Sequence, residues 1–126
     1  MSNLYYDLFI SKFIVSNRKE RLKYEIDSKK RKKDFINHFC HDTLKYINIK
    51  RIIFEGQPHD FFNRFQIRNR EMFFVVSELY DDGKMMTVDE LKLYIDNEYM
   101  SIVAISNSIA IIKEETEFNS HIYVLQ

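Results

Sequence analysis

Apolar residues recur at three- and four-residue spacings through the first forty positions, a pattern typical of an amphipathic helix. The stripe consists of Leu4, Leu8, Phe9, Phe13, Ile14, Val15, Leu22 and Ile26. No Gly or Pro interrupts the chain from Met1 through Glu55. The pattern therefore predicts either one long helix or two helices that meet near Asp27 and Ser28.

Asp27 and Ser28 favour the break, because Ser28 has the chemistry of an N-cap. The apolar face of a second helix would then consist of Phe35, Ile36, Phe39 and Cys40. The cations of Lys29–Lys33 would occupy its first turns, where the helix dipole disfavours each by roughly a few tenths of a kcal/mol. Either the helix continues unbroken, or this basic run serves a purpose that outweighs the penalty.

The middle of the chain is punctuated at Gly56-Gln57-Pro58. Before it, Ile49–Glu55 has the composition of a short strand. After it, Pro58 suits the first position of a helix over about 58–68. Phe61, Phe62 and Phe65 would face the core from that helix.

The second half changes to a strand-like pattern. Met72–Val76 predicts a strand buried on both faces. Asp81-Asp82-Gly83 predicts a turn, and Lys84–Met86 a return strand. Thr87 and Glu90 then form a capping box, in which each side chain accepts a bond from the other residue's backbone N–H. The helix that follows is expected to bury Val88, Leu91, Ile95 and Tyr99.

The last elements read from the pattern are strands. Ile102–Ile105 and Ile109–Ile112, joined by a turn at Asn107-Ser108, predict a hairpin, and His121–Leu125 a final strand. The predicted fold class is α+β: an N-terminal helical part packed on a small, mainly antiparallel sheet, with one further capped helix. We expect a single domain over residues 1–126, with a helical part (1–47) and a mixed part (49–126).

Charge divides the chain at Arg70. Residues 1–70 carry 16 Lys+Arg and 8 Asp+Glu, a net +8, whereas residues 71–126 carry 3 and 11, a net −8. The net charge of zero therefore conceals two opposite halves. Such a distribution produces a field that steers charged partners, or copies of the same protein, toward one another.

Other features of the composition limit the function classes. Cys40 is the single cysteine, which excludes an internal disulfide and suits the cytoplasm. We expect no secretory signal and no membrane span, because the first residues lack a basic n-region and the apolar runs are short. Gly56 and Gly83 are the two glycines, too few for a phosphate-cradling loop.

Two blocks of the chain resemble stretches of small uncharacterised bacterial proteins. The first runs from Arg18-Lys19-Glu20-Arg21-Leu22 through Lys29–Cys40 and His41, and the second from Ser77 to Ile112. The resemblance implies a bacterial origin. It names no family and transfers no functional residue.

The basic segment 18–33 is the strongest candidate for a binding site. Its cations are Arg18, Lys19, Arg21, Lys23, Lys29, Lys30, Arg31, Lys32 and Lys33. A surface of this kind attracts phosphate backbones through counterion release, and Tyr24 and Phe35 flank it. A solvated helix face is the simpler interpretation of such a run.

The candidate metal ligands are His38, His41 and Asp42, which share a helix face at three- and four-residue spacings. No further ligand from a distant part of the chain is assigned to complete such a site. Two histidines near a helix C-terminus also interact favourably with the helix dipole without any metal. We therefore assign no metal or cofactor to the chain.

No motif for nucleophilic or metal-assisted catalysis is present, so we expect a protein that is not an enzyme. The methionines and the exposed-looking tyrosines suggest a partner-binding patch, although core filling is the simpler account of most of them: Met85, Met86, Met100, Tyr5, Tyr6, Tyr80 and Tyr94. The first hypothesis is a small non-catalytic cytoplasmic binding protein that recognises a protein partner or itself through charge complementarity. The alternative is a nucleic-acid-binding protein that uses the basic segment 18–33.

Overall fold

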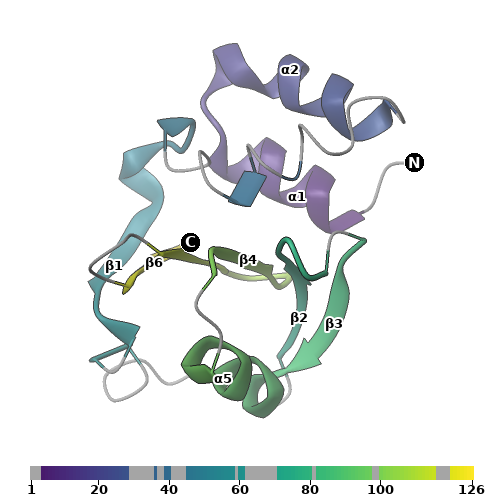
Figure 1. Ribbon diagram of the computed structural model, residues 1–126. Coiled ribbons are helices and arrows are strands. Elements are labelled where there is room, and N and C mark those ends of the chain that lie inside the picture. The colour runs from purple at the N-terminus through teal and green to yellow at the C-terminus, as the bar shows by residue number, and fades with distance from the viewer. Residues whose placement is uncertain are drawn as a thin grey trace.

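The computed structural model describes residues 4–28, 36, 39–40, 45–58, 60–61, 71–80, 82–97, 100–115 and 120–126 (Figure 1). In chain order the elements are α1 (Leu4–Phe13), α2 (Ser16–Asp27), the 3₁₀ turn η4 (Ile49–Arg51), β1 (Ile52–Gly56), β2 (Met72–Val76), β3 (Lys84–Thr87), α5 (Val88–Asn97), β4 (Ile102–Ile105), β5 (Ala110–Glu115) and β6 (Ser120–Leu125). Among these helices, none is long and apolar enough to span a bilayer.

The strands form one six-stranded sheet in the order β1-β6-β5-β4-β2-β3. Every neighbouring pair is antiparallel. Helices α1 and α2 lie on one face of this sheet and α5 lies on the other (Figure 1). The α+β prediction, with N-terminal helices on an antiparallel sheet, is confirmed.

Each face of the sheet has its own hydrophobic core. Phe74 and Val76 of β2 join the helix-side core, which packs against α1, whereas Phe73 and Val75 join the α5-side core. Successive strand side chains point to opposite faces, so a strand covered on both sides reads as a continuous apolar run. The predicted strand Met72–Val76 is confirmed, and four of its five residues are buried on the two faces; Met72, at 42% exposure, is the exception.

Helix α1 buries a stripe of Tyr6, Phe9, Ile10 and Phe13 against the sheet. Phe9 and Phe13 belong to the predicted stripe, but Leu4 is 76% exposed. The stripe is rotated because Tyr6 meets Phe74 edge to face, with ring centroids 5.2 Å apart. When apolar residues occur on every side of a helix, their pattern predicts the helix but does not show which face is buried.

The helix breaks at a position that the sequence did not indicate. α1 ends at Phe13 and α2 begins at Ser16, so the expectation of unbroken helix to Asp27 is wrong. The Val15 N–H donates to the Tyr46 carbonyl (2.8 Å), and the Asn48 N–H donates to the Phe13 carbonyl (2.8 Å). These two bonds to a distant segment replace the intrahelical bonds that a continuous helix would make.

The break expected near Asp27 is present: α2 ends there, and Ser28 is extended with φ −93° and ψ 116°. The basic run Lys29–Lys33, which follows Ser28, lies outside the described residues. Three members of the next apolar face, Ile36, Phe39 and Cys40, are buried in the helix-side core.

The segment predicted as the strand Ile49–Glu55 begins instead with η4, and the strand starts at Ile52. The Asn48 side chain accepts a bond from the Lys50 N–H (3.1 Å), which caps this 3₁₀ turn. Of the helix expected over 58–68, Pro58, Asp60 and Phe61 are helical, and Phe61 is buried; residues 62–68 lie outside the described part.

The capping box at the start of α5 is confirmed. The Thr87 N–H donates to Glu90 Oε1, and the Glu90 N–H donates to Thr87 Oγ1, each over 3.2 Å. The 102–112 hairpin and the last strand are also confirmed, as β4, β5 and β6. Val88, Leu91 and Ile95 are buried as expected, and Tyr94 is buried with them. Tyr99, also expected on this face, lies outside the described residues.

Strand β5 extends past the apolar run and contains a buried Lys113. This side chain is 2% exposed. Its Nζ donates to the Ile95 carbonyl in the last turn of α5 (3.0 Å) and pairs with the Glu115 carboxylate (2.9 Å). A buried charge needs such partners, and this one ties the end of α5 to the sheet.

Candidate functional site

The four cations of α2 do not share one face of the helix. Arg18 and Arg21 are three residues apart and lie on one side. Lys19 turns toward α1, where its Nζ donates to the Ser11 carbonyl (2.8 Å). Lys23 follows Arg21 by two residues, about 200° around the helix. Lys23 instead lies four residues after Lys19, on the side of that residue. Of the basic residues that the structure describes in this segment, Arg18 and Arg21 are the pair that lines a hollow.

These two arginines line a hollow of about 190 Å³, which we call the arginine pocket. Its lining residues are Arg18, Arg21, Leu22, Glu25 and Tyr46. The Arg18 guanidinium lies over the Tyr46 ring, 5.2 Å from the ring centroid. A guanidinium stacked in this way keeps its N–H groups at the edge of its plane, where a carboxylate or phosphate can accept two of them.

Arg21 is held by a different contact. Its Nε donates to Glu25 Oε1 over 3.1 Å, and the Glu25 side chain is only 2% exposed. A guanidinium has five N–H donors, and a single carboxylate oxygen cannot accept hydrogen bonds from all of them. Glu25 therefore fixes the direction of Arg21 without using up its hydrogen-bonding capacity.

Tyr46 is positioned by the same backbone contacts that interrupt the helix. Ile14 and Ile47 form an isolated antiparallel bridge, and both side chains are buried in the helix-side core. The bridge anchors the 45–48 segment beside the start of α2. No local pattern indicated this pairing, and Glu25 and Tyr46 were not predicted as site residues.

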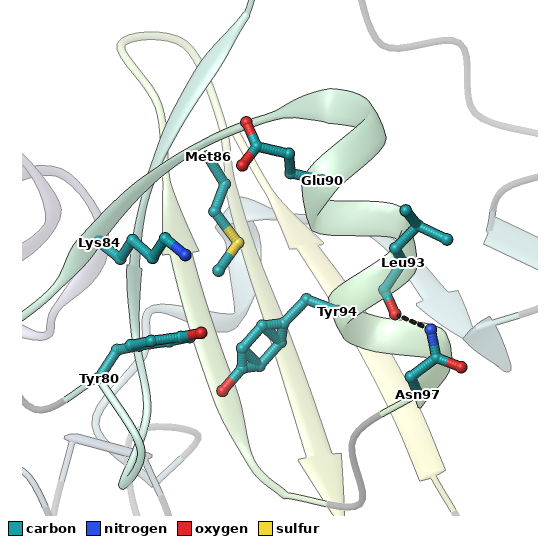
Figure 2. Close-up of a pocket in the computed structure, with 7 residues that line it drawn as sticks. All are labelled: Tyr80, Lys84, Met86, Glu90, Leu93, Tyr94 and Asn97. Atoms are coloured by element: carbon teal, nitrogen blue, oxygen red, sulfur yellow. Dashed lines mark hydrogen bonds between the residues drawn. The ribbon is translucent and has the colours of Figure 1, made fainter.

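A second hollow, of about 320 Å³, lies between β3 and α5; we call it the edge groove (Figure 2). It is lined by Tyr80, Lys84, Met86, Glu90, Leu93, Tyr94 and Asn97. The helix contributes Glu90, Leu93, Tyr94 and Asn97, whose spacings of three and four place them along one side.

Tyr94 of this groove looked exposed from the sequence, but the structure places it in the core, as the alternative of core filling had it. It is 8% exposed, and its hydroxyl lies 2.8 Å from Ser77 Oγ. Tyr6, from the same predicted patch, is also buried. A buried tyrosine needs a hydrogen-bond partner, and the sequence offered no sign that Ser77 supplies one.

The candidate metal ligands His38, His41 and Asp42 lie outside the described residues. In the part that the structure does describe, no group of three or more His, Cys, Asp or Glu side chains could hold a metal ion. Cys40 is buried, and burial is the main cause that raises the pKa of its thiol to about 12, with a smaller contribution from the Glu78 charge. Its thiol is therefore a poor nucleophile at neutral pH.

No family model, curated protein or solved structure matches this chain.

Proposed function

We propose that this protein is a non-catalytic cytoplasmic binding protein that recognises an acidic protein surface, on a partner or on a second copy of itself, through the arginine pocket. One observation carries the proposal: Arg18 and Arg21 line the same hollow, and each guanidinium is held by a contact of its own. Preorganised arginines lose little freedom when they bind a carboxylate.

The distribution of charge supports the same function. The basic residues of α2 and the acidic first turn of α5, Asp89 and Glu90, lie on opposite faces of the sheet (Figure 1). One copy can therefore present its arginine pocket to the acidic face of another without burying like charges together. The buried, unreactive Cys40 suits a reducing cytoplasm.

The test compares two variants that remove the same charge. Arg18→Gln/Arg21→Gln alters the pocket, and Lys23→Gln/Lys50→Gln removes two exposed cations outside it. Binding of a hexaglutamate peptide and self-association by sedimentation are measured from low salt to about 0.5 M. We expect the first variant to weaken peptide binding at least about tenfold, equivalent to about 1.4 kcal/mol, and the second by less than about threefold.

A further variant, Arg18→Lys/Arg21→Lys, keeps the positive charges but removes the planar guanidinium groups. Lys is a point charge that cannot bind a carboxylate in the bidentate manner, so this variant should also lose affinity. Equal binding by all variants, or binding that persists unchanged in high salt, would contradict the proposal.

Nucleic acid is the second candidate ligand, and one observation favours it. Tyr24 is 56% exposed on α2, and the Arg21 guanidinium lies 5.9 Å from its ring centroid. An exposed aromatic ring beside a cation is the arrangement on which unpaired bases stack.

The test is a titration of labelled single-stranded RNA and duplex DNA across salt. Tyr24→Ala should weaken RNA binding with little effect on the acidic peptide, and replacing Lys29–Lys33 by Gln should flatten the salt dependence. An unchanged affinity in both variants removes this candidate.

A further inference from the structure

Within the described residues, the edge groove runs beside an edge strand of the sheet. β3 is the last strand in the sheet order, and α5 follows it directly in the chain. Lys84 and Met86 of the strand face Glu90, Leu93 and Tyr94 of the helix, with Tyr80 at one end (Figure 2). An exposed sheet edge can take up an extended peptide as an added strand, while pockets beside the edge accept its side chains.

The backbone of β3 has a donor and an acceptor in position for such a peptide. The Thr87 N–H donates to the Glu90 carboxylate rather than into the sheet. Backbone groups of successive residues in a strand point to alternate sides. Met85 therefore directs its N–H and C=O away from β2, whereas Lys84 and Met86 direct theirs toward it. The Met85 side chain is 40% exposed at this edge.

The floor of the groove is apolar and fixed. Met86 and Tyr94 are 3% and 8% exposed. Besides its contact with Ser77, the Tyr94 hydroxyl lies 3.3 Å from the Met100 sulfur. The Tyr80 and Tyr94 rings are 5.3 Å apart and tilted by 57°. Leu93, at 64% exposure, stands at the rim. A floor of this kind suits a bulky apolar side chain.

The segment that forms the groove is acidic in composition. This segment, residues 78–97, carries the exposed carboxylates Glu78, Asp82, Asp89, Glu90 and Asp96 and the two cations Lys84 and Lys92. Of these charged side chains, Glu90 and Lys84 line the groove itself. The Lys84 ammonium is held over the Tyr80 ring, 5.0 Å from its centroid, and the net charge of the segment remains negative. Charge complementarity therefore favours a basic residue in the occupant.

We propose that the edge groove binds an extended basic peptide segment of a partner protein. The peptide backbone pairs with Met85, one bulky apolar side chain enters the hollow over Tyr94, and a flanking Lys or Arg lies near Glu90. This site is on the opposite side of the sheet from the arginine pocket and does not depend on it. With both sites occupied, the protein bridges an acidic surface and a basic segment.

The first experiment uses a fluorescently labelled peptide, acetyl-Lys-Val-Phe-Val-Lys-amide, and measures its anisotropy. Leu93→Glu is the site variant, and Ile49→Glu is its control. Ile49 is also exposed (76%), but it lies in η4, just before β1 at the other edge of the sheet. We expect Leu93→Glu, or replacement of the peptide Phe by Ala, to weaken binding at least about tenfold, and the control to change it by less than about twofold. Reversing the peptide charges should also weaken binding.

The second experiment tests the backbone contact. Met85→Pro removes the outward N–H, and proline is tolerated on an edge strand where that group faces solvent. The variant should keep its circular dichroism spectrum and bind the peptide at least about tenfold more weakly. Met85→Leu, which retains the N–H, should bind normally.

Three results would overturn the proposal: no binding of the peptide up to about 1 mM, equal binding by Leu93→Glu, or unfolding of Met85→Pro, which would mean that this N–H belongs to the sheet. The Arg18→Gln/Arg21→Gln variant should bind the basic peptide like the wild type. A variant that loses binding of the basic peptide but keeps binding of the acidic peptide tests the edge groove, and the reverse tests the arginine pocket, so the two proposals can fail separately.

Discussion

Replacing Lys113 by Met removes a buried charge while it keeps most of the side-chain volume. The change deletes a charge-assisted hydrogen bond to the Ile95 carbonyl, a contact that contributes about 1.5–3 kcal/mol. It also leaves the Glu115 carboxylate, 15% exposed, without this cation. Breaking a buried pair costs about 3–5 kcal/mol. Glu115 still accepts a bond from the Ser120 hydroxyl, so we expect the lower value, a loss of about 3 kcal/mol.

Urea unfolding followed by circular dichroism measures this loss, and Lys23→Met, at an exposed position, is the matched control. The control should change the unfolding free energy by less than about 0.5 kcal/mol. Hydrogen exchange adds a local readout, because the amides in the last turn of α5 should lose protection first.

A double-mutant cycle separates the pair from its surroundings. Lys113→Met/Glu115→Gln removes both charges. Its loss of unfolding free energy should be smaller than the sum of the two single losses by about 1–2 kcal/mol, which is the coupling energy of the pair. A single-variant loss below about 1 kcal/mol would refute the reasoning, because it would mean that the Ile95 carbonyl and Glu115 find equal partners without Lys113.

Three further predictions follow from buried contacts. Gly83→Ala should lower the unfolding free energy by about 2 kcal/mol or more, since φ is +83° and a Cβ would lie 2.1 Å from the Phe74 ring; unchanged urea unfolding would contradict this. Burial raises the pKa of the Cys40 thiol from 9.0 to about 12, so the unfolded thiol ionises first and stability falls as pH rises from 9 toward 12. Cys40→Ala should flatten that alkaline decline in unfolding free energy, and an equal slope would count against it. Tyr94→Phe should lose about 1 kcal/mol through its bond to Ser77; in a cycle with Ser77→Ala, additive losses would show that the bond contributes nothing.

Local chemistry explains what the sequence predicted well. The capping box of Thr87 and Glu90 lies within four consecutive residues, so its two bonds need no distant partner. The apolar run Met72–Val76 is also a local signal: an uninterrupted run of apolar residues indicates a strand that is covered on both faces, and Met72 alone departs from that. The α+β class followed from assembling such local signals.

Contacts between distant segments explain what the sequence missed. The break after Phe13 depends on bonds to Tyr46 and Asn48, about thirty residues away. The arginine pocket depends on the same bridge, so Arg18 and Arg21 were predictable as cations but their pairing with Tyr46 was not. Lys113 was outside the predicted strand because a lysine after an apolar run usually marks its end.

The pairing of β1 with β6 has a consequence for how the chain folds during its synthesis. Ile52 pairs with Leu125, so β1 has no neighbour in the sheet until nearly all of the described chain has emerged. The apolar stripe of α1 waits as well, because its partners Phe74 and Val103 come from later strands. At about 5–20 residues per second, this delay lasts several seconds. The nascent N-terminal half therefore exposes its apolar surface for much longer than a helix takes to form.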